Sequence, residues 1–406
     1  MVVAVIGAGA SGLMAACAAS HIAGTEVLLL EGQKRAGRKL LATGNGRCNL
    51  SNRDMDMSHY HGTGKELAER VFSSFGREET LELFRGMGLI TVDDGRGRTY
   101  PYSDRASSVL DVLRAEAAAR GVRLVPESRA ARISPHGGRF EIITETGAAF
   151  KADRVVVCTG GPTAPKLGGC RDGYSLLGSF GHTLIEPRPS ISRILARADW
   201  LPPLDGIRAQ ANAKLLDASG QITAESCGEF QFVKDGISGP AAFDISGTVS
   251  EGRARSIVLD LLPDELEGNS EEYLKKIIKD RPSMEAGKIF EGFLHSRLSL
   301  AAVKNAGIKP SAPASSITEG GIVKLASSVS SLRAEVKGVP GFDDAQASAG
   351  GINGLEFKDS LESCLVPGLY AAGEVVDVDG DCGGYNLQWA WSSGFTAGSA
   401  AAGANR

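Results

Sequence analysis

A chain of 406 residues with 42% hydrophobic and 23% charged residues has ordinary globular composition but is too long for one compact core, so we expect two or three structural units. A formal net charge of -4 and a pI near 6.0 argue against nucleic acid or an anionic membrane surface as a partner. Seven scattered cysteines without a Cys-x-x-Cys pair argue against a disulfide framework, and the absence of a signal peptide or a run of about 18 apolar residues predicts a cytoplasmic protein.

The first thirty residues predict a strand, a glycine-rich turn, a helix and a second strand. Residues 2–6 and 27–30 are the apolar runs of the two strands, and the Ala-rich residues 13–19 form the helix between them. This order is that of a βαβ unit with a parallel sheet. The turn reads Gly-Ala-Gly-Ala-Ser-Gly, and Glu31 ends the second strand nineteen residues after Gly12.

Each position of this turn has a physical role in binding a dinucleotide. Gly7 permits the tight turn, Gly9 lets the backbone approach a pyrophosphate, and Gly12 lets the helix pack closely on the strand. The helix N-terminus offers free N–H groups to the phosphates, and Glu31 is placed to accept from the adenosine ribose hydroxyls. A plain glycine-rich turn is the alternative, but the strand, the helix and the acid together favour a dinucleotide.

The following segments predict helices that cover the sheet and strands that extend it. Apolar residues recur at helical spacing over residues 65–87 and again over 106–120. Residues 129–134 and 139–151 alternate like short strands. Residues 154–158 form a continuous apolar run, which is typical of a buried parallel strand.

An insertion follows residues 186–189, where two prolines punctuate the chain before a region of alternating patterns. Within it, residues 270–307 have helical period and are split at Pro282. We therefore predict three parts. A dinucleotide domain of the FAD or NAD type comprises residues 1–189 and 346–406. An inserted β-rich domain comprises residues 190–259 and 308–345, and a helical subdomain comprises residues 260–307.

Two later strands favour FAD as the dinucleotide. Residues 155–161 are an apolar strand that ends in Thr-Gly-Gly, and residues 368–374 are a second strand that ends in a glycine and an acid. FAD is longer than NAD by a ribitol and a tricyclic ring, so it requires a second backbone approach and an acceptor for ribitol hydroxyls. Gly373 and Glu374 would supply these. Because this strand lies near the C-terminus, both chain ends must close the fold.

A helix N-terminus is predicted after Gly383 and Gly384. The dipole and the free N–H groups there would stabilise negative charge on the reduced flavin, and so favour its acceptance of a hydride. A glycine-containing loop before a packing helix is the alternative.

A basic loop, residues 37–52, follows the first βαβ unit. Its three cations, Arg38, Lys39 and Arg47, with several glycines and asparagines, would neutralise the pyrophosphate and then hydrogen-bond the edge of the isoalloxazine ring. A solvated basic loop is the alternative.

Together these motifs resemble one family. Besides the N-terminal fingerprint, the chain carries Gly-Arg-Lys-Leu-Leu-Ala-Thr-Gly-Asn-Gly-Arg-Cys-Asn from Gly37, Gly-Ile-Ser-Gly-Pro from Gly236, and a long motif over residues 371–388. These are similar to the bacterial BaiN-like NAD(P)/FAD-dependent oxidoreductases, also called the aminoacetone oxidase family. The resemblance implies an α/β, two-lobed, discontinuous FAD-binding Rossmann-like fold with an inserted β-barrel-like domain and a small helical subdomain.

The motifs and the resemblance give the residues that we expect to bind FAD. They come from the glycine-rich turns, the two acids, the basic loop and the start of the last helix: Gly7, Ala8, Gly9, Ala10, Ser11, Gly12, Glu31, Gly32, Arg38, Lys39, Asn45, Gly46, Arg47, Cys48, Asn49, Ala130, Thr159, Gly160, Gly161, Gly373, Glu374, Gly384, Tyr385, Asn386 and Leu387. No catalytic residue is assigned.

Histidines and cysteines outside the core motif have two interpretations. His59 and His61 would suit a metal, but no carboxylate or cysteine nearby in the sequence completes a ligand set, so solvated loop histidines are favoured and no metal is expected. Cys48 and Cys382 are either redox thiols or small packed thiols, of which the second is the commoner role.

Three tyrosines near the flavin motifs also have two interpretations. Tyr100, Tyr102 and Tyr385 are either proton donors or ring-stacking walls of the flavin site, or ordinary core and surface tyrosines.

The predicted function is that of an FAD-dependent oxidoreductase with a small-molecule substrate. The leading hypothesis is a reductase that passes a hydride from reduced FAD to an activated C=C bond or similar acceptor, with NAD(P)H as donor. Only one complete Gly-x-Gly-x-x-Gly is present, so NAD(P)H would bind transiently. One alternative is an oxidase that acts on a small amine with oxygen as acceptor. A further alternative, which the acidic pI disfavours, is a flavin-binding protein without turnover of its own or a flavoenzyme that modifies nucleic acid. The oligomeric state is not predicted.

Overall fold

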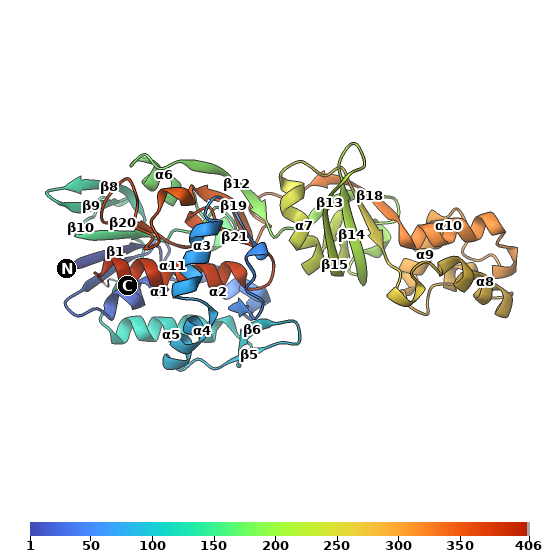
Figure 1. The fold of residues 1–406 in the computed structure, drawn as a ribbon, viewed down its shortest axis with the longest axis horizontal. Coiled ribbons are helices and arrows are strands. Elements are labelled where there is room, and N and C mark those ends of the chain that lie inside the picture. Colours follow the sequence, from blue (N-terminus) through green and yellow to red (C-terminus); the bar gives the residue numbers. More distant parts are fainter. Residues whose placement is uncertain (404–406) are drawn as a thin grey trace. The chain divides into compact units, whose positions relative to one another are not determined.

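The structure, a computed structural model, describes residues 1–403 and divides the chain into two compact units. Unit 1 comprises Met1–Pro189 and Phe342–Arg406, and unit 2 comprises Ser190–Gly341. The blue N-terminal and red C-terminal parts of the chain thus belong to the same unit (Figure 1). Among the described residues, no helix combines the length and the apolar character needed to cross a bilayer.

The centre of unit 1 is a parallel sheet in the order β20-β11-β1-β2-β7. In chain order its strands are β1 (Val2–Ile6), β2 (Glu26–Leu30), β7 (Arg123–Val125), β11 (Arg154–Val157) and β20 (Leu369–Ala371). Val5 is in register with Leu29 on one side and with Val156 on the other. The C-terminal strand β20 pairs with β11, so the predicted Rossmann-like sheet closed by both chain ends is confirmed.

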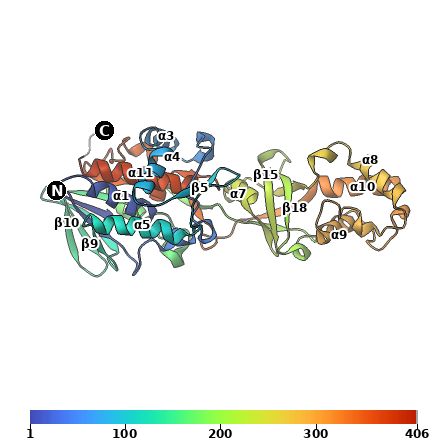
Figure 2. The same ribbon diagram turned by 90° about the horizontal axis from the view of Figure 1, so that it is seen from below.

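Two helices from opposite ends of the chain, α1 (Ala10–Ser20) and α11 (Tyr385–Ala401), lie side by side in unit 1 (Figures 1 and 2). Small residues allow this close approach. A Cβ atom on Gly394 would lie 2.4 Å from the carbonyl oxygen of Ser11, and one on Gly398 would lie 2.2 Å from that of Ala15. These two glycines are therefore required by helix packing.

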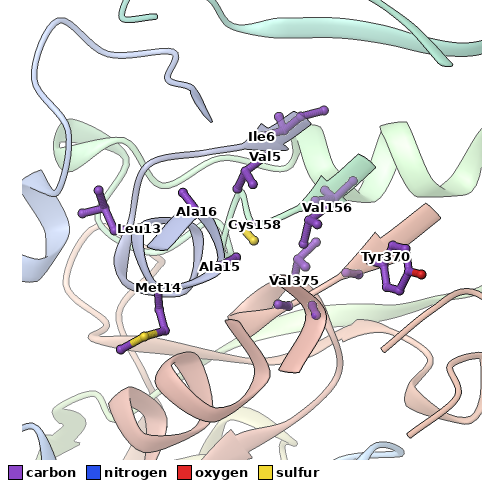
Figure 3. Packing of buried hydrophobic residues seen from close by; sticks show 14 of the residues in the cluster. Val5, Ile6, Leu13, Met14, Ala15, Ala16, Val156, Cys158, Tyr370 and Val375 are labelled. Atoms are coloured by element: carbon purple, nitrogen blue, oxygen red, sulfur yellow. The ribbon is translucent and has the colours of Figure 1, made fainter. Parts of the chain in front are cut away.

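The core of unit 1 joins side chains from both ends of the chain. Val5 of β1, Ala15 of α1 and Val156 of β11 are fully buried in one cluster, and Val375 from the C-terminal part packs in the same cluster (Figure 3). Burying a valine or leucine side chain contributes about 1.5–3 kcal/mol relative to exposure. The C-terminal segment is thus part of the core of the N-terminal βαβ unit.

The other elements of unit 1 surround this core. Its helices are α2 (Arg38–Ala42), α3 (Lys65–Ser74), α4 (Arg77–Gly86), α5 (Ala106–Ala119) and α6 (Asp172–Gly178). The antiparallel sheets are formed by β8 (Ala130–His136), β9 (Arg139–Thr144) and β10 (Ala149–Ala152); by β3 (Ser51–Asn52), β6 (Arg98–Pro101) and β5 (Thr91–Asp93); and by β4 (Tyr60–His61) with β21 (Asp379–Gly380). A last pair is β12 (Leu184–Ser190) with β19 (Ala347–Ile352).

The helix predicted over residues 65–87 is two helices, α3 and α4. The break falls at Gly76, whose backbone is extended, and the Glu79 carboxylate accepts from the Gly76 N–H at 2.9 Å. This contact caps a new helix. The apolar spacing on either side of Gly76 is helical, so periodicity alone did not reveal the break.

Unit 2 contains the predicted barrel, closed in the order β13-β16-β15-β14-β17-β18. Its strands are β13 (Ile194–Arg197), β14 (Arg208–Leu216), β15 (Ile222–Val233), β16 (Gly236–Ser238), β17 (Ser256–Asp260) and β18 (Leu332–Gly338). Helix α7 (Pro240–Ser250) packs on the barrel. The helical part, α8 (Ser270–Asp280), α9 (Ser296–Asn305) and α10 (Glu319–Ser330), lies between β17 and β18 in the chain.

The helical part differs from the predicted range 260–307 in two ways. Helix α10 lies in a segment that we expected to be β-rich, and the Thr318 hydroxyl caps it by accepting from the Gly321 N–H at 3.2 Å. Residues 289–294 are turns and not α-helix. Phe290 is nevertheless buried, so the apolar period of this segment reflects a compact buried turn.

Candidate functional site

A pocket opens in unit 1 where β1 and β2 end, the usual ligand site of open parallel sheets. Ile6 and Leu30, the last residues of these strands, line it. Most of the residues predicted to bind FAD also line it: Gly7, Ala8, Gly9, Ala10, Ser11, Glu31, Gly32, Arg38, Lys39, Ala130, Thr159, Gly160, Gly161, Glu374, Asn386 and Leu387. Residues that are far apart in sequence, from Gly7 to Leu387, thus share one cavity.

The glycines of the first turn have different surroundings. Gly7 has a φ of +98°, and a Cβ there would lie 2.5 Å from the Cys158 carbonyl oxygen. A Cβ on Gly12 would lie 1.8 Å from the Gly7 carbonyl oxygen. In contrast, a Cβ on Gly9 would have no atom within 4 Å. Gly9 lines the pocket and precedes α1, whose N-terminus has no side-chain cap. The open space and the free first-turn N–H groups fit a phosphate.

Glu31 lies at the pocket wall with its carboxylate anchored by the backbone. Its Oε2 accepts from the Ala8 N–H at 2.8 Å, and its Oε1 accepts from the Gln33 N–H at 2.7 Å. Each carboxylate oxygen has a second lone pair. The anchored carboxylate can therefore still accept from a ligand hydroxyl.

Glu374 is the centre of a polar network that the motifs did not predict. Its Oε2 accepts from Lys39 Nζ at 2.7 Å, and its Oε1 accepts from the Ser348 N–H at 2.8 Å and the Ser348 hydroxyl at 2.9 Å. The Thr163 hydroxyl and the Gly161 N–H add longer contacts of 3.3 and 3.4 Å. Lys39 also donates to the Thr163 hydroxyl. The basic loop and the C-terminal strand are thereby joined at the pocket.

These contacts keep Glu374 ionised. Burial alone would raise its pKa, but the Lys39 ammonium and the hydrogen bonds from Ser348 outweigh burial and hold the pKa below its usual range. Tyr174 lies close to this network, and burial followed by the Glu374 charge raises the pKa of its phenol. Its buried hydroxyl has no hydrogen-bond partner among the described residues. A neutral phenol beside an ionised carboxylate is the resulting arrangement.

Part of the basic loop does not line this pocket. Asn45, Gly46 and Arg47 are exposed, and Arg47 pairs with Asp104 while its guanidinium lies 4.2 Å from the centre of the Tyr100 ring. Asn45 and Gly46 have positive φ values, so they form a tight turn. The role that we predicted for these three residues at the isoalloxazine ring therefore remains a prediction.

Six further predicted residues are not among those that line the pocket. Four of them are buried, Gly12, Cys48, Gly373 and Tyr385, and two are half-buried, Asn49 and Gly384. Burial raises the pKa of the Cys48 thiol to about 12, so this thiol is protonated at neutral pH, as a packed thiol is. A Cβ on Gly373 would lie 2.5 Å from the Ser11 hydroxyl, and one on Gly384 would lie 2.5 Å from the Ser51 carbonyl oxygen. Gly373 thus leaves room for the Ser11 side chain, and Gly384 for the backbone at Ser51.

His59 and His61 both contact Asp381, which is distant in sequence, and His59 Nε2 also lies 3.3 Å from Oδ2 of the neighbouring Asp54. Asp381 accepts from both, at 2.9 Å from His59 Nδ1 and 2.8 Å from His61 Nε2. His59 also stacks on Tyr385, with ring centres 4.5 Å apart. We expected no carboxylate or cysteine nearby in the sequence to complete a ligand set, and the pairing with Asp381 was not anticipated. Within residues 1–403, no three His, Cys, Asp or Glu side chains are grouped as a metal site.

A buried carboxylate lies beside these histidines in β21. Burial raises the pKa of Asp379 to about 7, and the charges of Asp377 and Asp381 add to this effect, while His61 and Arg188 oppose it. Asp377 itself is fixed, because its Oδ2 accepts from the Thr63 N–H and hydroxyl, both at 2.8 Å.

Some pocket residues are not among those that we predicted to bind FAD. The largest group is the segment around Pro165–Cys170, with Gln33, Arg35, Arg129 and Gln346. Arg129 forms a two-point ion pair with Asp172, at 2.5 and 2.8 Å, beside the pocket. The local signal for this segment was a pair of adjacent glycines, Gly168 and Gly169. Pairings such as Arg129–Asp172 leave no local signal, because they depend on the tertiary fold.

A family model and several relatives match almost the whole chain. The model for the HI0933-like protein Rossmann domain matches residues 1–400. A 3-dehydro-bile acid delta(4,6)-reductase of Clostridium scindens is 37% identical, with 98% of both chains covered. A ribosomal RNA dihydrouridine synthase of Escherichia coli is 28% identical over 96% of this chain and 95% of that protein.

Solved structures show the same fold. A 3-ketosteroid delta1-dehydrogenase of Sterolibacterium denitrificans aligns with a TM-score of 0.51 at 12% identity, covering 99% of each chain. The quinol fumarate reductase of Escherichia coli aligns with a TM-score of 0.50 at 15% identity, over 98% of this chain and 69% of that one.

Proposed function

The chain belongs to the HI0933-like family and is an FAD-dependent oxidoreductase, and we propose that it is a reductase that passes a hydride from reduced FAD to an activated C=C bond of a small molecule, with NAD(P)H as donor. One observation carries this proposal. The names of its full-length relatives describe the reduction of an unsaturated 3-oxo bile acid and the formation of dihydrouridine. Both are additions of hydrogen to a C=C bond conjugated with a carbonyl group.

The pocket residues that we propose for FAD complement its phosphates and its hydroxyl groups. FAD supplies the hydride-transfer chemistry when it is bound. The uncapped start of α1 and the open space at Gly9 would hold the pyrophosphate. Glu31 would accept from the adenosine ribose, and Lys39, oriented by Glu374, would lie along the ribitol chain. Glu374 would thus position Lys39, in addition to making the ribitol contact that the motif predicts.

We propose a second role for the start of α11. This helix begins after Gly384 without a side-chain cap, and Asn386 and Leu387 of its first turn line the pocket. The free N–H groups and the positive dipole end there would stabilise negative charge on the reduced flavin. That favours acceptance of a hydride from the donor.

A small molecule is the substrate class that the charge favours. The formal net charge is -4, whereas proteins that bind RNA through its phosphates generally present excess positive charge. The relative that reduces a bile acid is also 37% identical, against 28% for the dihydrouridine synthase. RNA is the second candidate, because two ribosomal RNA dihydrouridine synthases match 96% of the chain.

Separating the two half-reactions tests the reductase. The purified protein is reduced anaerobically with NADPH, NADH or dithionite, and flavin absorbance is followed by stopped flow. We expect bleaching by a nicotinamide donor, then reoxidation by a 3-oxo-4-ene steroid faster than by oxygen. Rapid reoxidation by oxygen with stoichiometric peroxide, and none by the enone, would support the oxidase alternative instead.

The RNA candidate has its own readout. The reduced protein is incubated with unmodified ribosomal RNA, and dihydrouridine is measured by mass spectrometry of nucleosides. Formation of dihydrouridine at rates that exceed steroid reduction would replace the small molecule by RNA while leaving the reductase chemistry intact.

A further inference from the structure

A second cleft in unit 1 adjoins the proposed FAD pocket. It is lined by residues of α2 and α5, and its volume of about 560 Å³ lies in the range of small-molecule sites, roughly 300–1,000 Å³. Arg35 and Arg38 line both the cleft and the FAD pocket, and Arg114 of α5 completes the cationic wall. No function discussed above uses this cleft.

In the described part of the chain, the three arginines of the cleft have no carboxylate partner. Within residues 1–403, none of them is joined to an Asp or Glu side chain by an ion pair, and Arg38 donates to the Gln33 amide oxygen at 2.9 Å. Other arginines of unit 1 are paired, as Arg129 is with Asp172. The only carboxylate in the lining is Asp111, so the cleft has an excess of positive charge.

The remaining lining is apolar or neutral. Leu110 and Leu167 are lining residues, and Leu41 remains 40% exposed although it is a large apolar side chain. Guanidinium groups bind phosphates through two parallel hydrogen bonds and stack on flat rings. A cationic wall beside apolar side chains therefore matches a ligand that joins a heteroaromatic ring to phosphate groups.

We propose that this cleft binds the 2′-phosphoadenosine half of NADPH and so makes NADPH, rather than NADH, the preferred donor. The inference rests on the proposed function, because it requires a nicotinamide donor. The single Gly-x-Gly-x-x-Gly turn is committed to FAD, so the donor phosphates need another partner. Arginine is the side chain that dinucleotide enzymes use for the 2′-phosphate. Asp111 and Ser107 belong to the same lining, where either could accept from the ribose 3′-hydroxyl, the one hydroxyl that a 2′-phosphorylated ribose keeps.

The test measures binding of a fragment and not turnover. 2′,5′-ADP is titrated calorimetrically into the FAD-loaded protein, and 5′-AMP, which lacks the 2′-phosphate, is the comparison ligand. We expect 2′,5′-ADP to bind the parent and Arg114→Gln to weaken it about tenfold, the effect of losing one contact worth about 1.4 kcal/mol. Arg35→Gln should weaken it similarly. Arg132→Gln, at an exposed arginine outside the cleft lining, is the matched control and should bind as the parent does.

A kinetic readout separates this inference from the proposed function. In anaerobic flavin reduction, Arg114→Gln should raise the half-saturating NADPH concentration about tenfold and leave the limiting rate and the NADH response unchanged. FAD content is measured in each variant, and Arg114 does not line the FAD pocket, so a loss of cofactor is recognised. If NADPH reduces the parent but the arginine variants bind 2′,5′-ADP and NADPH as tightly as the parent, the cleft assignment alone is overturned.

Two further outcomes decide the inference. If 2′,5′-ADP binds and the arginine variants lose it, the cleft assignment stands even when no enone is reduced. If Arg114→Gln instead weakens retention of single-stranded RNA and leaves 2′,5′-ADP binding unchanged, the cleft belongs to a nucleic-acid substrate and the donor site must be sought elsewhere.

Discussion

Two helices begin at the cofactor pocket after a glycine, and the two glycines serve different physical needs. Gly9, before α1, has an ordinary φ of -82°, and a Cβ there would meet no atom within 4 Å. Gly384, before α11, has a φ of +105°, and a Cβ there would lie 2.5 Å from the Ser51 carbonyl oxygen. Both helix N-termini lack side-chain caps. The first glycine leaves room for a ligand, whereas the second is required by the protein's own backbone.

This difference shows what a glycine-rich motif does and does not reveal. The same pattern, a glycine directly before a helix, arises from close approach of a ligand and from close approach of another segment. Substitution separates the two cases, because the first should affect cofactor binding alone and the second should affect the fold with or without cofactor.

The largest expected effect is that of Gly9→Val on cofactor binding. The valine side chain would occupy the space proposed for the pyrophosphate, so FAD affinity should fall more than about a hundredfold, or about 2.7 kcal/mol. Stability of the apoprotein should change by less than about 1 kcal/mol, because a Cβ at this position has no atom within 4 Å. FAD titration and thermal unfolding of the apoprotein measure both quantities. Retention of full FAD by Gly9→Val would show that the pyrophosphate does not lie at this turn.

Gly384→Ala should show the opposite behaviour. The added Cβ would strain a backbone with positive φ and collide with the Ser51 carbonyl, so we expect about 2–3 kcal/mol of destabilisation in the apoprotein. Thermal unfolding without FAD is the measurement, and Gly9→Ala is the matched control, expected to unfold like the parent. An unchanged unfolding temperature for Gly384→Ala would mean that the turn before α11 adapts freely.

The next effect concerns the charged pair that joins the two ends of the chain. Glu374→Ala should weaken FAD binding about ten- to a hundredfold, since a hydrogen bond to a charged group contributes about 1.5–3 kcal/mol. Glu374→Gln should lose less, because it keeps the shape and one acceptor. FAD titration of the apoprotein measures each affinity.

A double-mutant cycle with Lys39→Met distinguishes two roles of Glu374. If Glu374 acts by orienting Lys39, the double variant should bind FAD about as weakly as either single variant. Additive losses would mean that the carboxylate contacts the cofactor independently of Lys39. FAD binding by Glu374→Ala at parental affinity would contradict both roles.

The smallest effect is a pH dependence at Asp379. Its pKa is raised to about 7 in the fold, so its contribution to stability is fully present below the unfolded pKa near 3.8 and is lost as pH rises to about 7. Asp379→Asn should remove this loss and raise the free energy of unfolding by roughly 1 kcal/mol at pH 8, but not at pH 4. A shift of one pKa unit corresponds to ~1.4 kcal/mol, so a gain of this size requires only part of the shift to appear in the free energy of unfolding. Equal destabilisation of the Asp379→Asn variant at pH 4 and at pH 8 would contradict this prediction.

The fold was largely predictable because its signals are local. The apolar run at residues 155–157 and the turn Gly7–Gly12 specify buried strands and a dinucleotide-type turn from adjacent residues alone. The helical part of unit 2 was less predictable, because the buried turn at residues 289–294 has the same apolar spacing as a helix.

The polar network of the site could not be predicted, because it depends on contacts across the whole chain. Ser348 carries no motif, and its role becomes visible only when its N–H and hydroxyl both donate to Glu374. The pairing of His59 with Asp381 is a similar case. Such side chains are ordinary in sequence, and their significance comes from the tertiary positions that the fold gives them.

The order of the chain has a consequence for synthesis on the ribosome. Strand β20 and helix α11 complete the sheet and the core of unit 1, yet they are translated after all of unit 2. Unit 2 is continuous in the chain, so it can fold while the N-terminal βαβ unit still lacks its last strand. During that interval β11 presents an unpaired edge where β20 will later bind. Glu374, Asn386 and Leu387 of the pocket are also translated last, so the proposed FAD site would be complete only at the end of translation, and a prematurely terminated chain would be recognisable by its exposed sheet edge.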